Sequence, residues 1–395
     1  MNRKIKYMRS IVLVAGVLLL SLSFLNAETA EKATDPEEAS AKGVDSLKVI
    51  AYYGGGENEI DNYAVEELDQ IIYSFLHLMG NKLWVKSEAQ DAALRKLVSL
   101  KKDHPNLEIL ISLGGWGGCE TCSEVFSKQK NRTAFAKSVL KILKIYGADG
   151  IDLDWEYPAI EGHPGHGHKA ADKRNFTLLI KTLRDVLGTD YQLSFAAGAH
   201  LEFLNNSIEW DSVMPLVDNV NIMTYDLVNG YSKTTGHHAG LYSSSEQAIA
   251  ADYTISYLDS MGVPLNKMVI GAAFYARIWS GVDSLNNGLY QKGVFQTSIL
   301  YKDFASYFDD QWEMHWDSTA NAPYAYNASQ KLFATFDDVT SVANKTNYAQ
   351  TKGLKGIMFW ELTQDVPKGK KGSLLHAIAQ QILLHKNEIK IQQKE

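Results

Sequence analysis

Three acidic residues alternate with large apolar ones in residues 149–158, DGIDLDWEYP. Side chains of a strand alternate between its two faces, so Asp152, Asp154 and Glu156 share one face and the apolar residues share the other. Three carboxylates so close together cannot all ionise cheaply, because each negative charge raises the pKa of the next. At least one of them should keep its proton near neutral pH, as a general acid requires.

Two other interpretations of this stretch are open. A solvated acidic turn would expose the acids, whereas the interleaved Ile, Leu and Trp indicate a buried strand. A Mg²⁺ or Ca²⁺ site would use the same carboxylates, but no backbone-rich Gly/Asn loop accompanies them. His163, His166 and His168 follow in a Gly- and Pro-rich loop. Nothing there fixes ligand geometry, so we expect a rim loop and no metal.

Eight short runs of β-branched or aromatic residues must position these acids, and amphipathic stretches separate most of them. The predicted strands are residues 49–53, 71–78, 109–113, 151–155, 193–197, 220–225, 268–274 and 357–360. Predicted helices include residues 89–102, 132–146, 175–187, 245–261 and 339–351. This alternation indicates an α/β fold, a (β/α)8 TIM barrel over residues 47–385. An open doubly wound sheet is the alternative, although residues 54–56, GGG, are too short a match to its phosphate-binding fingerprint.

The interval between the seventh and eighth predicted strands, from Met268 to Ile357, is about 90 residues. One crossover helix cannot use so many, so residues 278–331 should form an inserted subdomain. Because βα loops lie at the C-terminal face of a barrel, this insertion would stand beside the acidic residues. Residues 386–395 are a charged tail without a packing pattern.

Residues 1–27 have the layout of a secretory signal peptide: four basic residues, an apolar run over residues 11–20 and a small-residue end at Ala27. A membrane anchor is the alternative, but the apolar run is short for a bilayer span. Residues 28–46 lack an apolar period and are expected to be a flexible lead-in. We therefore expect a secreted protein, extracellular or periplasmic, that leaves the membrane after cleavage.

Charge and cysteine content exclude several classes of protein. The net charge is −7, and without residues 1–27 the 35 Lys and Arg stand against 46 Asp and Glu, a charge of −11. Such a surface argues against nucleic acid and anionic membranes as partners. Cys119 and Cys122 are the only cysteines, which excludes a four-cysteine zinc site. We expect a local disulfide, no cofactor and a monomer.

The acidic stretch resembles the Asp-x-x-Asp-x-Asp-x-Glu signature of glycoside hydrolase family 18, the chitinases, with Asp149 as its first residue. Four further matches follow in the family's order: residues 112–116, SLGGW; 223–226, MTYD; 274–277, FYAR; and 358–361, MFWE. The resemblance covers residues 48–384. It implies a barrel with a small α+β insertion between strands seven and eight, and hydrolysis of β-1,4-linked polymers of N-acetylglucosamine.

The resemblance also implies a retaining, substrate-assisted mechanism, which differs from the two-carboxylate scheme. Glu156 would be the acid and base, Asp154 would hold the substrate's acetamide N–H, and Asp152 would share a proton with Asp154. Tyr225 would orient the acetamide oxygen. Asp149 belongs to the motif without a role at the reacting bond.

Further residues would bind the substrate. Trp360 is expected under the sugar at the scissile bond and Trp116 under the next sugar, since an indole plane matches the apolar face of a pyranose. The other expected binding residues are Asp226, Met223, Phe75, Tyr275, Arg277, Tyr52 and Ser112. Ala276 replaces the family's usual Gly, so the local backbone and the direction of the Arg277 side chain stay undetermined by the resemblance. Trp279, Trp312 and Trp316 are equally compatible with a sugar-stacking surface and with the core of the insertion.

Two alternative functions remain. A chitinase-like lectin would bind oligosaccharides without cleaving them, but such proteins typically lack the terminal acid that Glu156 supplies. A glycosidase acting on N-glycans or peptidoglycan would use the same residues. We expect chitin or N-acetylglucosamine oligosaccharides as the partner, with end-wise or internal attack and processivity left open.

Overall fold

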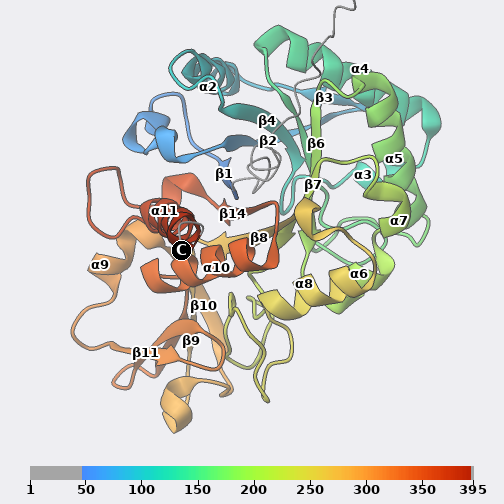
Figure 1. Cartoon of the computed structure of the whole chain (residues 1–395). Coiled ribbons are helices and arrows are strands. Elements are labelled where there is room, and N and C mark those ends of the chain that lie inside the picture. Colours follow the sequence, from blue (N-terminus) through green and yellow to red (C-terminus); the bar gives the residue numbers. More distant parts are fainter. Residues whose placement is uncertain (1–46, 393–395) are drawn as a thin grey trace, which may run out of the picture. The chain divides into compact units, whose positions relative to one another are not determined.

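The computed structural model describes residues 47–392, so the predicted signal peptide and lead-in lie outside the described residues. Eight parallel strands form a closed barrel surrounded by helices (Figure 1). In chain order the barrel strands are β1 (Lys48–Tyr53), β2 (Gln70–Met79), β4 (Glu108–Gly114), β5 (Gly150–Asp154), β6 (Gln192–Gly198), β7 (Asn219–Met223), β8 (Met268–Ala273) and β14 (Gly356–Trp360). Strand β1 pairs with both β2 and β14, which closes the ring. The predicted TIM barrel is confirmed.

Side-chain alternation along β5 divides the core into two layers. Ile151, Leu153 and the following Trp155 are buried between the strands and the helices. Asp152 is also fully buried and faces the barrel interior, where the apolar neighbours include Tyr52 and Met358. The pairing register places Ser112 of β4 and Ser194 of β6 level with Asp152. The barrel interior therefore surrounds this carboxylate with hydroxyl groups.

The helices outside the barrel follow their expected strands, with one difference. They are α2 (Glu88–Ser99), α3 (Cys122–Phe126), α4 (Gln129–Tyr146), α5 (Asp172–Leu187), α6 (Leu201–Asn206), α7 (Trp210–Val213), α8 (Ala251–Ser260), α10 (Val339–Lys352) and α11 (Leu374–Gln392). Helix α8 begins later than the predicted residue 245. Instead, Gln247 donates its backbone N–H to the hydroxyl of Ser244 (3.1 Å). This side-chain hydrogen bond holds residues 244–247 in a non-helical conformation.

The insertion between β8 and β14 is a five-stranded antiparallel sheet with the order β10-β9-β13-β12-β11. Its elements are β9 (Tyr275–Ser280), β10 (Val294–Leu300), α9 (Phe304–Tyr307), β11 (Glu313–Asp317), β12 (Ala322–Asn327) and β13 (Leu332–Thr335). It is wider than the predicted residues 278–331, because only Phe274 separates β8 from β9. Trp279 and Trp312 are buried in its core, whereas Trp316 is 41% exposed.

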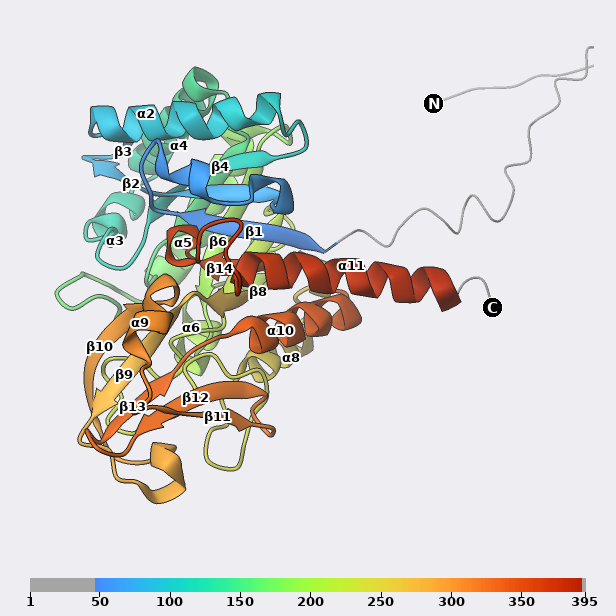
Figure 2. The same cartoon turned by 90° about the vertical axis from the view of Figure 1, so that its left-hand side faces the viewer.

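A short strand and the last helix also differ from the sequence-based expectation. Strand β3 (Lys82–Trp84) pairs antiparallel with the end of β2. Helix α11 lies beside α10 and continues to Gln392, through much of the predicted tail (Figure 2). Ile382 is buried, whereas Leu383, Leu384 and Ile391 are 52%, 55% and 60% exposed, so these three apolar side chains lie outside the core. Within residues 47–392 we find no helix long and apolar enough to span a membrane.

Candidate active site

Asp152 lies at the centre of a hydrogen-bond network inside the barrel. Its Oδ2 accepts from the hydroxyls of Ser112 (2.9 Å) and Tyr52 (3.2 Å). Its Oδ1 accepts from Ser194 Oγ (2.6 Å) and Asn221 Nδ2 (3.2 Å). Burial raises the pKa of Asp152, and these four donors oppose the rise. The network therefore fixes the carboxyl group in place and leaves its pKa above the ordinary value.

Asp154, at the end of β5, is buried and poorly satisfied. Only 4% of its surface is exposed, and no group among residues 47–392 hydrogen-bonds to its Oδ1. Burial raises its pKa well above the ordinary value, and the charges of Glu156 and Asp152 raise it further. A buried polar atom without a partner is costly, so this oxygen is suited to accept a donor from a bound molecule.

Glu156 follows two residues after β5 and is half-buried. Burial raises its pKa to about 7, a hydrogen bond with Tyr157 opposes the rise, and the charge of Asp226 adds to it. A carboxyl group with this pKa keeps its proton near neutral pH and can still release it. Glu156 thus has the protonation state of a general acid.

An aromatic surface lines the barrel mouth beside these acids. Trp360, the last residue of β14, stacks on Phe75 with ring centroids 5.3 Å apart and an interplanar angle of 15°. Gly115 has φ 80°, and a Cβ there would lie 2.3 Å from the Phe75 ring, so only glycine fits. The next residue, Trp116, is 49% exposed. Together they offer flat faces to a ligand.

An ion pair between Asp226, which follows β7, and Arg277 of the insertion lies near Glu156. Arg277 donates through Nε and Nη2 to the two oxygens of Asp226 (2.8 and 2.5 Å). Burial alone would raise the pKa of Asp226, but the nearby His238 and the hydrogen bonds from Arg277 hold this pKa well below its usual range. Ala276 is buried on the opposite face of β9, so it does not deflect Arg277. Asp226 is therefore a fixed negative charge.

Two tyrosines beside Asp226 and Arg277 pack against each other. Tyr225 and Tyr275 meet edge to face, with centroids 6.3 Å apart. The hydroxyl of Tyr225 lies 3.9 Å from Met358 Sδ, a weak acceptor, so it can donate to a ligand. Met223, at the end of β7, is half-buried against the same interior cluster.

Asp149 does not join the other acids. It precedes β5, at the opposite end of the strand from Glu156. Its Oδ2 accepts from the backbone N–H of Ile109 (2.7 Å), and its Oδ1 accepts from Lys101 Nζ (2.5 Å). Asp149 therefore links β4, β5 and the end of the preceding helical segment.

Sequence reasoning missed several members of the site. Ser194 and Asn221 are polar residues inside predicted apolar strands, a signal that was available. Tyr157 follows the acid directly, and its pKa is raised by burial and by the charge of Glu156. His238, whose Nδ1 lies 3.6 Å from Asp226 Oδ1, comes from a loop without any periodic pattern.

The remaining predicted features lie around the mouth of the barrel. Cys119 and Cys122 are joined by a disulfide and are both buried. The rings of His163 and His166 lie 4.6 Å apart. No set of three or more His, Cys, Asp or Glu residues within 47–392 is arranged to hold a metal ion.

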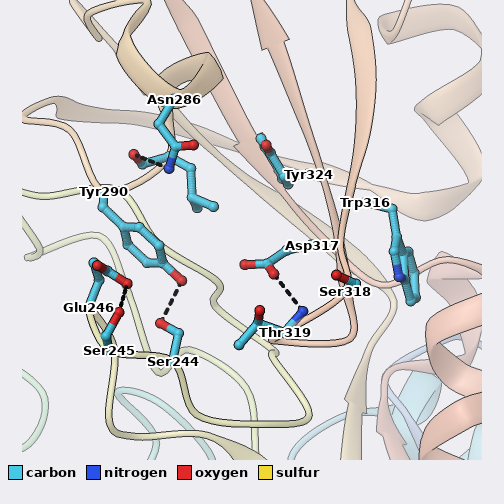
Figure 3. A pocket seen from close by; sticks show the side chains of 11 residues that line it. Ser244, Ser245, Glu246, Asn286, Tyr290, Trp316, Asp317, Ser318, Thr319 and Tyr324 are labelled. Carbon is cyan, nitrogen blue, oxygen red and sulfur yellow. Dashed lines mark hydrogen bonds between the residues drawn. The ribbon is translucent and has the colours of Figure 1, made fainter.

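A pocket of about 330 Å³ lies between the insertion and the loop after β7 (Figure 3). Tyr290 donates or accepts a hydrogen bond with Ser244 there (2.9 Å), and Asp317 faces them across the opening. Trp316 points away from these side chains, as alternation along β11 requires. None of the three clustered acids lines this pocket, so it is separate from the site described above.

Comparisons with known proteins agree with this arrangement. The family model described as glycosyl hydrolases family 18 matches residues 48–365. Chitinase A1 of Niallia circulans is 36% identical over 86% of this chain, which spans only 59% of that protein's length. Mouse chitotriosidase-1 is 30% identical over 76% of this chain and 67% of its own.

Solved structures extend the likeness to the fold. A glycoside hydrolase family 18 N-acetylglucosaminidase from Paenibacillus barengoltzii superposes with a TM-score of 0.77 at 33% identity. The alignment covers 85% of this chain and 99% of that one. With the family model matching most of the chain and the acids brought together at the barrel mouth, the chain belongs to glycosyl hydrolases family 18.

Proposed function

We propose that this protein is a chitinase, which hydrolyses β-1,4 linkages between N-acetylglucosamine units with Glu156 as acid and base and the substrate's own acetamide as nucleophile. Glu156 gives its proton to the glycosidic oxygen while the bond from that oxygen to the anomeric carbon breaks. The acetamide oxygen bonds to the same carbon, which forms an oxazolinium ion. Water then attacks this carbon, and the Glu156 carboxylate takes the proton from the water.

The observation that carries this proposal is that the three clustered acids have different hydrogen-bond surroundings. Glu156 has a pKa of about 7 and so can supply a proton. Asp154 has a buried oxygen without a hydrogen-bond partner among the described residues, which an acetamide N–H would satisfy. Its ionised form would also stabilise the positive charge of the oxazolinium ion.

The surrounding residues suit an N-acetylated sugar. The Tyr225 hydroxyl can donate to the acetamide oxygen and aim it at the anomeric carbon. Trp360 supplies a flat apolar face, held by Phe75, for the sugar at the scissile bond. The names of the two curated relatives support chitin as the substrate, whereas the related N-acetylglucosaminidase favours release of single sugars as the second candidate.

Stereochemistry and substrate scope test the mechanism together. The first product from an N-acetylglucosamine oligomer should keep the β configuration, because two displacements occur at one carbon. Fully deacetylated chitosan should resist cleavage, because it offers no acetamide oxygen. An early α-anomer in a proton NMR time course would contradict the proposal, and the product sizes decide between the two candidates.

We also propose that the protein is exported and acts as a monomer. The layout of residues 1–27 supports export. Amino-terminal sequencing of protein recovered outside the cytoplasm should begin after Ala27. Retention of the full chain in the membrane would contradict export.

A further inference from the structure

The loop that follows Glu156 returns toward the acid and touches the exposed tryptophan of the neighbouring strand. His163 in this loop meets Trp116 edge to face, with ring centroids 5.5 Å apart and an interplanar angle of 64°. A Cβ on Gly117 would lie 3.4 Å from the same imidazole ring. His163 is therefore packed directly against the residues after β4.

The loop is seated firmly enough to hold this contact. A Cβ on Gly162 would lie 2.1 Å from the carbonyl oxygen of Glu156, so the loop backbone packs tightly against the acid's own backbone. The His163 ring also lies beside that of His166, tilted by 38°, and its Nδ1 lies 3.0 Å from the carbonyl oxygen of Pro164. The imidazole is thus held by its own loop.

Two aromatic side chains contact Trp116, one directly after Glu156 and one further along the loop. Tyr157, 6.3 Å away between centroids, is itself packed against His200 and Phe203 at 5.4 and 5.3 Å. His163 is the second neighbour. The Trp116 indole is 49% exposed, so half of its surface lacks contacts that would hold it. The contacts with Tyr157 and His163 therefore restrict its orientation.

Trp116 lies on the acid's side of the barrel mouth. Glu156 and Trp116 follow the adjacent strands β5 and β4, whereas Trp360 ends β14, far around the ring from both. If the sugar at the scissile bond lies over Trp360, as proposed above, Trp116 on the acid's side of the mouth is placed for the next sugar, on the leaving-group side.

We infer that His163 is a positioning residue that holds the Trp116 indole ready to stack the leaving-group sugar, so that the enzyme favours substrates with a sugar on that side. This inference rests on the proposed function and adds a specificity determinant to the same site. Free rotation of an exposed indole would have to be lost on binding, and the contact with His163 removes part of that cost beforehand.

Two substrates separate this effect from general damage. N-acetylglucosamine tetrasaccharide places sugars on both sides of the bond, whereas the β-fluoride of the disaccharide has a leaving group of one atom. His163→Ala should lower kcat/KM for the tetrasaccharide by about 2- to 10-fold relative to the fluoride, the range of an edge-to-face aromatic pair. His163→Phe keeps that edge and should restore the ratio.

A double-mutant cycle tests whether His163 acts through Trp116. Once Trp116→Ala has lowered the ratio, adding His163→Ala should lower it no further. His168→Ala, an exposed change in the same loop, is the matched control and should leave the ratio at the wild-type value. Equal ratios in wild type and His163→Ala, or additive losses in the double variant, would overturn this inference alone. A wild-type enzyme that cleaves neither substrate would contradict the proposed function itself.

Discussion

Each of the three clustered carboxyl groups has a different set of neighbours, and this difference assigns their chemistry. Asp152 is surrounded by donors, Asp154 has a buried oxygen without one among the described residues, and Glu156 is half-buried with a pKa of about 7. Burial raises the pKa of all three groups, while their hydrogen-bond partners and neighbouring charges differ.

Glu156→Gln separates catalysis from binding at the residue scale. The change keeps the side-chain volume but removes the transferable proton, so hydrolysis should fall by about 10² to 10⁴. The aromatic surface of Trp360 is untouched, so affinity for an oligomer should stay near wild type. Trp360→Ala is the comparison variant and should weaken binding as well as rate. Hydrolysis rates and calorimetric binding constants measure both variants. Near-full hydrolysis by Glu156→Gln would contradict the assignment of Glu156 as the general acid.

At the scale of elements, a buried ion pair attaches α10 to the barrel strand from which the insertion departs. Lys345 Nζ lies 2.5 Å from Asp337 Oδ2, and both side chains are fully buried. The same oxygen accepts from the backbone N–H of Ala273, the last residue of β8 (3.0 Å). Ser341 donates to the other oxygen (2.7 Å). The Asp337 carboxylate therefore connects a helix, a strand end and the return from the insertion.

Lys345→Met tests this connection. The change leaves Asp337 buried without its cation, which typically costs about 3–5 kcal/mol in the free energy of unfolding. Lys352→Met is the matched control on the same helix, because the pair of Lys352 with Asp252 is 43% and 33% exposed and should be worth at most about 1 kcal/mol. Urea unfolding measures both variants. Equal midpoints for the two would show that the buried pair does not hold α10 in place.

At the scale of the whole molecule, the acid cluster should reduce stability at the pH where it is useful. Burial raises the pKa of Glu156 from 4.5 to about 7, so between these values the folded protein binds a proton that the unfolded chain has lost. The free energy of unfolding therefore falls as the pH rises from about 4.5 to about 7. Active sites that depend on strained electrostatics commonly carry such a cost.

Glu156→Gln should lose less stability than wild type over this pH interval. The variant has no titrating group at position 156, and the pKa of Asp154 is no longer raised by its charge. Denaturant unfolding at pH 4.5 and pH 7 should show that the free energy of unfolding of the variant rises relative to that of wild type as the pH rises. Parallel pH profiles for the two proteins would contradict the raised pKa of Glu156.

Much of this architecture followed from local pattern. Alternation along residues 149–158 placed the acids on one face, and eight strand-like runs predicted the barrel. The long interval before residue 357 predicted an insertion, although its ends were misplaced because β9 follows β8 almost without a break. The sequence of the tail lacked a packing pattern, yet α11 continues there because helix formation needs only local hydrogen bonds once a packed helix has begun.

Strand periodicity and motif spacing by themselves determined the barrel and the order in which the acids occur along and just after β5, because both depend on neighbours in the sequence. Tertiary structure alone decided which donors reach each acid. Asn221 and Ser194 meet Asp152 through strand register, and His238 and Arg277 reach Asp226 from a loop and from the insertion. The pKa of a carboxyl group depends on burial and on charges within a few ångströms, whichever part of the chain supplies them, and ring closure brings those parts together.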